Sequence, residues 1–160
     1  MLTCRVPAPD AQHGADRQEV VRALGRHPLA DELTATVTIG VTGASPWRAD
    51  DSRPRVAVLI GHGDLTRVQR AHLALADGIV VTDPSIARAA VASAPGALIA
   101  IAAGEDRAFL RGATPREADE AWSEVEDHRV LAHAIGGEGR ADTHRQTAEL
   151  VLELVVALGN

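Results

Sequence analysis

The sequence predicts a three-layer α/β domain with a mainly parallel sheet of about five strands, helices on both faces and one antiparallel edge strand. Three unbroken apolar runs indicate the central strands: VAVLI at 56–60, GIVV at 78–81 and ALIAI at 97–101. Such runs are typical of parallel strands that are covered on both faces. Segments with helical periodicity lie between the runs, and this alternation favours a layered sheet with right-handed crossovers.

The pattern of residues 34–42 predicts that this segment is the edge strand of the sheet. Apolar side chains alternate there with threonines, which indicates a strand with one solvent-exposed face. The next segment, 43–54, is rich in turn residues and has no helical period, so it cannot supply the usual crossover helix. We therefore expect 34–42 to pair antiparallel with 55–61. RVLAHAI at 129–135 is a further strand candidate.

Five helices are predicted, most of them from capping residues. The third begins at Pro84 after Asp83. The last runs from about Asp142 to Gly159, with four side chains facing inward: Leu150, Val151, Leu154 and Leu158. The second is expected to bury Leu65, Val68, His72 and Leu75. The N-terminal signals of the other three are Asp16 with Glu19, Asp64, and Thr114 with Glu117.

The length of 160 residues suits a single globular domain. The first fifteen residues contain two prolines and no period, so residues 1–15 are expected to form an irregular arm and 16–160 the domain. The acidic side chains of the fourth helix are expected to form a solvated face. They are Glu117, Asp119, Glu120, Glu124, Glu126 and Asp127.

Two missing residue types exclude several functions. All sixteen basic residues are arginine, so neither a Schiff-base lysine nor a phosphate-loop lysine is present. Tyrosine is absent and Phe109 is the only phenylalanine, which excludes tyrosine acid/base chemistry and aromatic platforms for single-stranded nucleic acid.

Charge and hydropathy limit the partners. The net charge is −6 and the arginines are dispersed, which argues against nucleic-acid binding. The longest apolar stretches have about eight to ten residues, too short for a membrane span. Cys4 is the single cysteine and no export signal is recognisable, so we expect a cytoplasmic protein.

The candidate binding site lies beyond the carboxyl ends of the strands, where open α/β sheets bind ligands. Glycines allow close approach of a ligand to the backbone, helix N-termini attract anions, and arginines can hold a carboxylate or phosphate with two hydrogen bonds. The candidate ligand-binding residues are Gly61, Gly63, Asp64, Glu105, Arg107, Gly136, Gly137 and Arg140.

The candidate catalytic residues are His62, Asp83, Ser85 and Asp106. His62 stands between two glycines at a strand end, which favours an exposed imidazole that can exchange a proton. The alternative is an ordinary loop histidine, with Asp64 acting as a helix cap. A metal site of His62, Asp64 and Asp83 is conceivable, but no second histidine follows at helical spacing, and we predict no metal. The sequence does not indicate whether a cofactor is bound, and this is left open.

Several segments resemble parts of α/β-hydrolases: HG at a strand end, GEDRAF after a strand and GGEGR before the last helix. The resemblance implies a nucleophile, acid and base in the order Ser85, Asp106 and then His133 or His144. That family presents its nucleophile as G-x-S-x-G, and this motif is absent here.

The function expected from these patterns is the binding of a small anionic metabolite or nucleotide, with hydrolase or transferase activity left open. One alternative is a non-catalytic subunit or homo-oligomer. Its interface would be the last helix, the threonine-rich strand or Trp47, which could equally be a lid over the core. A degenerate or truncated α/β-hydrolase-like domain is the other alternative.

Overall fold

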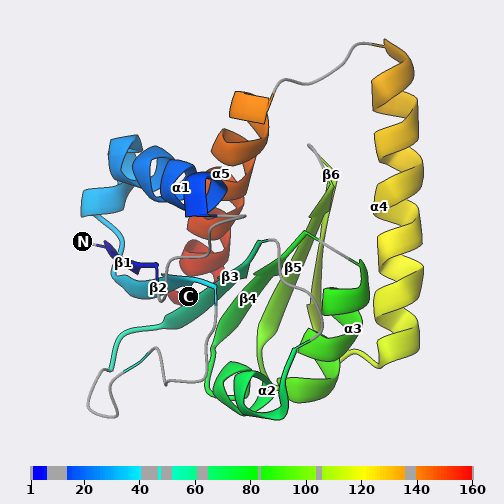
Figure 1. Ribbon diagram of the computed structural model, residues 1–160, viewed down its shortest axis with the longest axis horizontal. Helices are drawn as coiled ribbons and strands as arrows, with labels where there is room; N and C mark the ends of the chain where they lie inside the picture. The colour runs from blue at the N-terminus through cyan, green and yellow to red at the C-terminus, as the bar shows by residue number, and fades with distance from the viewer. Residues whose placement is uncertain are drawn as a thin grey trace.

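Six strands form one sheet in the order β1-β2-β3-β4-β5-β6 (Figure 1). The computed structural model describes residues 2–6, 14–40, 47, 52–60, 65–82, 84–103, 106–135 and 140–159, with the backbone alone at 14–16, 84–85, 102–103, 106, 126–135 and 140–143. The strands are β1 (Leu2–Arg5), β2 (Ala35–Ile39), β3 (Arg55–Leu59), β4 (Gly78–Val81), β5 (Leu98–Ala103) and β6 (Asp106–Arg111). The helices are α1 (Gly14–Arg26), α2 (Arg67–Leu73), α3 (Pro84–Ser93), α4 (Pro115–Ile135) and α5 (Arg140–Gly159), with a 3₁₀ turn, η1 (Pro28–Asp31), after α1.

Helices cover both faces of the sheet, which gives the three-layer α/β fold. On one side, called the α1/α5 face, Val20 of α1 and Leu154 of α5 pack with Val37, Val58 and the neighbouring buried side chains of the sheet. On the other side, called the α2–α4 face, helices α2, α3 and α4 cover the alternate residues of the same strands. Its core includes Leu73, Ile86, Trp122, Ala57 and Ile79.

The crossovers do not all have the same hand. β1-α1-β2 and β3-α2-β4 both join neighbouring parallel strands and step the same way along the sheet. Their helices lie on opposite faces, so the two connections have opposite hands. About 98% of such connections are right-handed, so the expectation of right-handed crossovers throughout is wrong for one of them.

The antiparallel pair lies at the opposite end of the sheet from the one predicted. β2 and β3 are parallel, with Val37 opposite Val56, so the expected antiparallel pairing of 34–42 with 55–61 is wrong. A parallel crossover needs about a dozen residues or more, and residues 40–54 supply that length. The antiparallel pair is β5 with β6, because only residues 104–105 separate them and so short a link makes a hairpin.

β2 is an interior strand. All of its residues are buried, and it lies between β1 and β3, so the predicted solvent-exposed edge is wrong. Thr36 and Thr38 remain in this core at 4% and 0% exposure. β1 takes the edge because residues 2–5, expected in an irregular arm, pair with β2 in parallel. The threonine alternation identified a strand but not its neighbours.

Two further predictions are wrong. Residues 129–135 continue α4 and do not form a strand. Asp106 and Arg107 were expected in a loop beyond a strand end, yet residues 106–111 form β6. A short apolar run cannot by its pattern alone be assigned to helix or strand, and the neighbouring segments decide.

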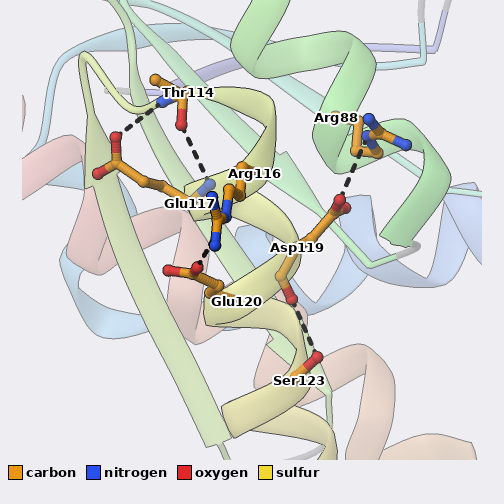
Figure 2. Close-up of polar contacts among 7 residues, drawn as sticks. All are labelled: Arg88, Thr114, Arg116, Glu117, Asp119, Glu120 and Ser123. Carbon is orange, nitrogen blue, oxygen red and sulfur yellow. Dashed lines mark hydrogen bonds and ion pairs between the residues drawn. The ribbon is translucent and has the colours of Figure 1, made fainter.

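Five helices form as predicted in the described part of the chain, and α3 begins at Pro84, but α1 begins at Gly14, so Asp16 lies inside the helix and its predicted role as the cap is wrong. Thr114 and Glu117 form the predicted capping box, with backbone-to-side-chain distances of 3.2 and 3.3 Å (Figure 2). In α5, Leu150, Val151 and Leu154 are at most 1% exposed. The acidic face of α4 is exposed at its four residues with described side chains, which are Glu117, Asp119, Glu120 and Glu124.

α2 differs from its prediction. Its N-cap is Thr66, which forms a capping box with Gln69, so Asp64 is not the cap. The buried side chains are Leu65, Leu73 and Ala76, whereas Val68 and Leu75, expected inside, are 50% and 49% exposed. α2 spans only Arg67–Leu73, so Leu65, Leu75 and Ala76 lie outside it and helical spacing does not decide which of them is buried.

Trp47 is 6% exposed and belongs to the core of the α2–α4 face, which confirms the lid interpretation and excludes an exposed anchor. Among the described helices, none has both the length and the apolar character that a membrane span needs.

Candidate functional site

The carboxyl ends of the central strands meet at one edge of the sheet, called the carboxyl edge. Leu59 lies opposite Val81, and Val81 opposite Ile101. The chain therefore leaves β3 at Ile60 and β4 at Thr82 in adjacent positions. The starting points of the loops predicted to hold the ligand lie together, as parallel pairing requires.

Most of the predicted site residues are outside the described part of the chain. These are Gly61, His62, Gly63, Asp64, Asp83, Glu105, Gly136 and Gly137. For three others the structure describes only the backbone: Ser85 is the second residue of α3, Asp106 the first of β6 and Arg140 the first of α5. Their chemical roles stay predictions.

Arg107 has a structural partner. It lies on β6, and its Nη1 is 2.5 Å from Oε1 of Glu153 on α5. The side chain of Arg107 is 26% exposed and that of Glu153 is 52% exposed, so this ion pair is partly screened by water. It links the outer strand to the helix that covers the α1/α5 face.

Arg17 is a candidate site residue that the sequence analysis missed. It lies in α1 and is 4% exposed. Its guanidinium donates to the carbonyl oxygen of Ile60, from Nη2 at 3.1 Å and from Nε at 3.4 Å. A guanidinium stays charged at any physiological pH, so α1 brings a buried positive charge to the end of β3.

A signal for Arg17 was present in the sequence. Arg17, Val20 and Leu24 are spaced at i, i+3 and i+7, which places them on one helical face. Val20 and Leu24 are 0% and 1% exposed, so that face is the buried one. An arginine on a buried stripe needs polar partners, because an uncompensated charge in a protein interior is costly.

Threonine side chains hold the backbone at this edge. Oγ1 of Thr82 donates to the carbonyl oxygen of Leu59 at 3.4 Å and connects the ends of β3 and β4. Oγ1 of Thr38 donates to the carbonyl oxygen of Gly40 at 3.2 Å. Gly40 has φ of 98°, a conformation that favours glycine. These hydrogen bonds fix the backbone at the strand ends, where the loops begin.

Helices α1 and α5 both direct their N-termini toward the carboxyl edge. A Cβ built on Gly78, the first residue of β4, would lie 2.8 Å from Leu154 and 2.9 Å from Leu158, so the end of α5 is at the opposite edge of the sheet. α1 begins near Arg17 and Ile60. Helix N-termini carry partial positive charge, which adds to that of Arg17.

The described side chains form neither a metal site nor a reactive thiol. Among residues with described side chains, no group of three or more His, Cys, Asp or Glu is placed to hold a metal ion. Cys4 lies on β1 against the α1/α5 face, and burial raises the pKa of its thiol. A raised pKa keeps the sulfur protonated and unreactive as a nucleophile.

No family model matches the chain, and comparison with curated proteins and with solved structures finds no match either.

Proposed function

We propose that the chain binds a small anionic molecule at the carboxyl edge, with Arg17 supplying positive charge and His62 exchanging a proton. The observation that carries the proposal is the burial of Arg17 against the carbonyl oxygen of Ile60. Ile60 directly precedes Gly61-His62-Gly63-Asp64. The charge of Arg17 therefore lies at the base of the loop predicted to contact the ligand.

The physical support for an anion is electrostatic. A charge held in a partly dry environment acts over a longer range than one in bulk water. The N-termini of α1 and α5 add to it, and an anion is the ligand class that both attract. A phosphate or a carboxylate satisfies this requirement, and a proton donor such as His62 suits the hydrolysis or transfer of either.

The test is a thermal-shift titration with inorganic phosphate, adenosine monophosphate and citrate. A ligand at ten times its Kd stabilises a chain of this size by about 1.4 kcal/mol, which is a rise of about 3–6 °C in Tm. We expect at least one of the three to reach this rise. We also expect His62→Ala and Arg17→Met to abolish the rise, and Arg17→Lys to retain part of it.

Arg88→Met is the matched control. Arg88 is an exposed arginine of α3 that pairs with Asp119 at 3.4 Å (Figure 2), away from Arg17. Its removal is expected to leave ligand stabilisation intact. If none of the three anions raises Tm, or if the anion response survives both His62→Ala and Arg17→Lys unchanged, the proposal is wrong.

The interaction-protein alternative loses two of its three predicted surfaces. The threonine-rich strand β2 is interior and Trp47 is buried. Of the hydrolase elements, Ser85 follows Thr82-Asp83-Pro84 at the start of α3 and has no G-x-S-x-G turn. Neither alternative has an observation that favours it over anion binding.

A further inference from the structure

Two adjoining grooves lie on the outer side of the α1/α5 layer. The first, about 350 Å³, is lined by Glu19, Ala23, Arg26, His27, Pro28, His144, Arg145 and Glu149, from α1, η1 and α5. The second, about 390 Å³, is lined by His27, Leu29, Glu149, Leu152, Glu153 and Val156. His27 and Glu149 line both grooves, so the two meet at these side chains.

Arg26 and Glu149 are opposite charges that face the first groove without pairing. Neither has a hydrogen bond or an ion pair with any residue of the described part of the chain. Two neighbouring carboxylates are already neutralised, Glu19 by Arg22 and Glu153 by Arg107. Arg145 also lines this groove and has an interaction of its own, so Arg26 and Glu149 are the guanidinium and the carboxylate without a partner among the described residues, and they are separated by more than ion-pair distance.

His27 adds a hydrogen-bond donor. Its Nδ1 accepts from the backbone N–H of Leu29 at 3.2 Å and caps η1. In the neutral imidazole, an accepting Nδ1 requires that Nε2 carry the proton. Nε2 is therefore the ring nitrogen that can donate to a ligand carboxylate beside Arg26.

The second groove has an apolar part formed by Leu29, Leu152 and Val156, and its remaining carboxylate, Glu153, is paired with Arg107. Leu152 is 2% exposed and forms its floor, whereas Leu29 and Val156 are 39% and 40% exposed. Covering half-exposed aliphatic side chains with a ligand is favourable, because each Å² of apolar surface removed from water contributes about 25 cal/mol to the free energy of binding. An aliphatic group of a ligand would supply that cover.

We propose that these grooves bind a zwitterion with an aliphatic side chain, which is the chemistry of an apolar α-amino acid. Its carboxylate pairs with Arg26 and with Nε2 of His27, its ammonium pairs with Glu149, and its side chain covers Leu29, Leu152 and Val156. The site is on the outer surface of α1 and α5 and does not depend on the function proposed for the carboxyl edge.

The test is an NMR titration of the ¹⁵N-labelled full chain with L-leucine, following the backbone amides of 27–32 and 149–156. Because the grooves are open, we expect a Kd on the order of 1 mM. Three analogues each lack one recognised group: 4-methylpentanoate the ammonium, 3-methylbutylamine the carboxylate, and glycine the side chain. Each is expected to bind roughly tenfold more weakly, or beyond detection.

Arg26→Gln and Glu149→Gln are expected to weaken L-leucine binding by the same factor. Arg88→Gln is the control, because Arg88 lies on α3 at the opposite face of the sheet, pairs with Asp119 and lines neither groove. It is expected to leave the Kd unchanged. The replaced side chains are all at the surface, so the circular dichroism of the three variants is expected to be unchanged.

Several outcomes overturn the proposal. One is the absence of amide shifts at 27–32 and 149–156 at about 20 mM L-leucine, well above the expected Kd. Another is binding of 3-methylbutylamine or 4-methylpentanoate as tight as that of L-leucine, which would mean a site for a single charge. A Kd that survives both Arg26→Gln and Glu149→Gln also overturns it. Failure here leaves the anion test untouched, because Arg17 and His62 take no part.

Discussion

The two faces of the sheet are built from different parts of the chain. The α2–α4 face is covered by helices that follow one another in sequence, and α2 and α3 each join the strands on which they pack. The α1/α5 face is covered by the first and the last helix, which lie side by side (Figure 1). One face can be assembled from local units, whereas the other requires the two ends of the chain to meet.

The cores of the two faces also differ in the residues that fill them. The α2–α4 face is filled by alanines, isoleucines and two tryptophans, whereas the α1/α5 face is mainly valine and leucine. The helices of the α1/α5 face also carry the buried polar side chains Arg17, Gln146 and Thr147. Buried polar groups need partners brought from elsewhere in the chain, so they mark the face where long-range contacts decide the structure.

The largest expected effect tests the α2–α4 face. Trp122 is 7% exposed and packs in that core, so Trp122→Ala is expected to lower the free energy of unfolding by about 3–5 kcal/mol in urea denaturation. Glu120→Ala on the exposed side of α4 is the control. It removes only a 3.4 Å surface pair with Arg116 and is expected to cost less than about 1 kcal/mol. Equal effects would mean that Trp122 is not in the core.

The next effect tests the packing of α5 on the sheet. A Cβ at Gly78 would lie 2.8 Å from Cδ2 of Leu154, so Gly78→Ala is expected to destabilise by about 1–3 kcal/mol. Added to Leu154→Ala, the same substitution is expected to cost less, because the closest clash is removed and only Cδ1 of Leu158, at 2.9 Å, still crowds the methyl group. Gly96→Ala, where no atom lies within 4 Å, is the control. Strict additivity at Gly78 would contradict the placement of α5.

A smaller effect tests the start of α4. Thr114→Ala removes the capping bond to the backbone N–H of Glu117 and is expected to cost about 1 kcal/mol (Figure 2). Ser123→Ala provides the contrast. Ser123 donates to the carbonyl oxygen of Asp119 inside the helix, a bond that does not support helix formation. If both variants have the same stability, the capping box does not contribute.

The smallest effect is a gain at α1. Gly25 lies inside the helix with open space around its Cα, so Gly25→Ala is expected to raise the free energy of unfolding by about 0.4–1 kcal/mol. The matched control is Gly112→Ala, which also has open space but has φ of 65° and is expected to destabilise. A loss of stability at Gly25 would indicate that α1 ends before it.

Prediction from the sequence succeeded where short-range chemistry decides. The central strands, the Thr114 and Glu117 box and the inward face of α5 all depend on residues within a few positions of one another. It failed for β1 and β6, and for 129–135, because a short segment becomes a strand only when another strand is beside it. The prediction that β2 runs antiparallel to β3 was wrong for the same reason.

The candidate site also has parts that the sequence predicts and parts that it does not. Parallel strands bring Ile60 and Thr82 to one edge, and this was predictable from the order of the apolar runs. Arg17 was missed because helical periodicity marks a buried position without saying what lies opposite. The groove between α1 and α5, with Arg26 and Glu149 on its two walls, joins residues from the two ends of the chain, and no local pattern connects them.

The sequence alone determined the fold class, where α3 and α4 begin, and the absence of lysine and tyrosine chemistry. These follow from backbone preferences, capping and composition, which act within a few residues or in the chain as a whole. The tertiary structure decided which strands are neighbours, the opposite hands of the two crossovers, the burial of Arg17 and the meeting of α1 with α5. Those depend on contacts between distant residues, whose free energy exists only once the chain has folded.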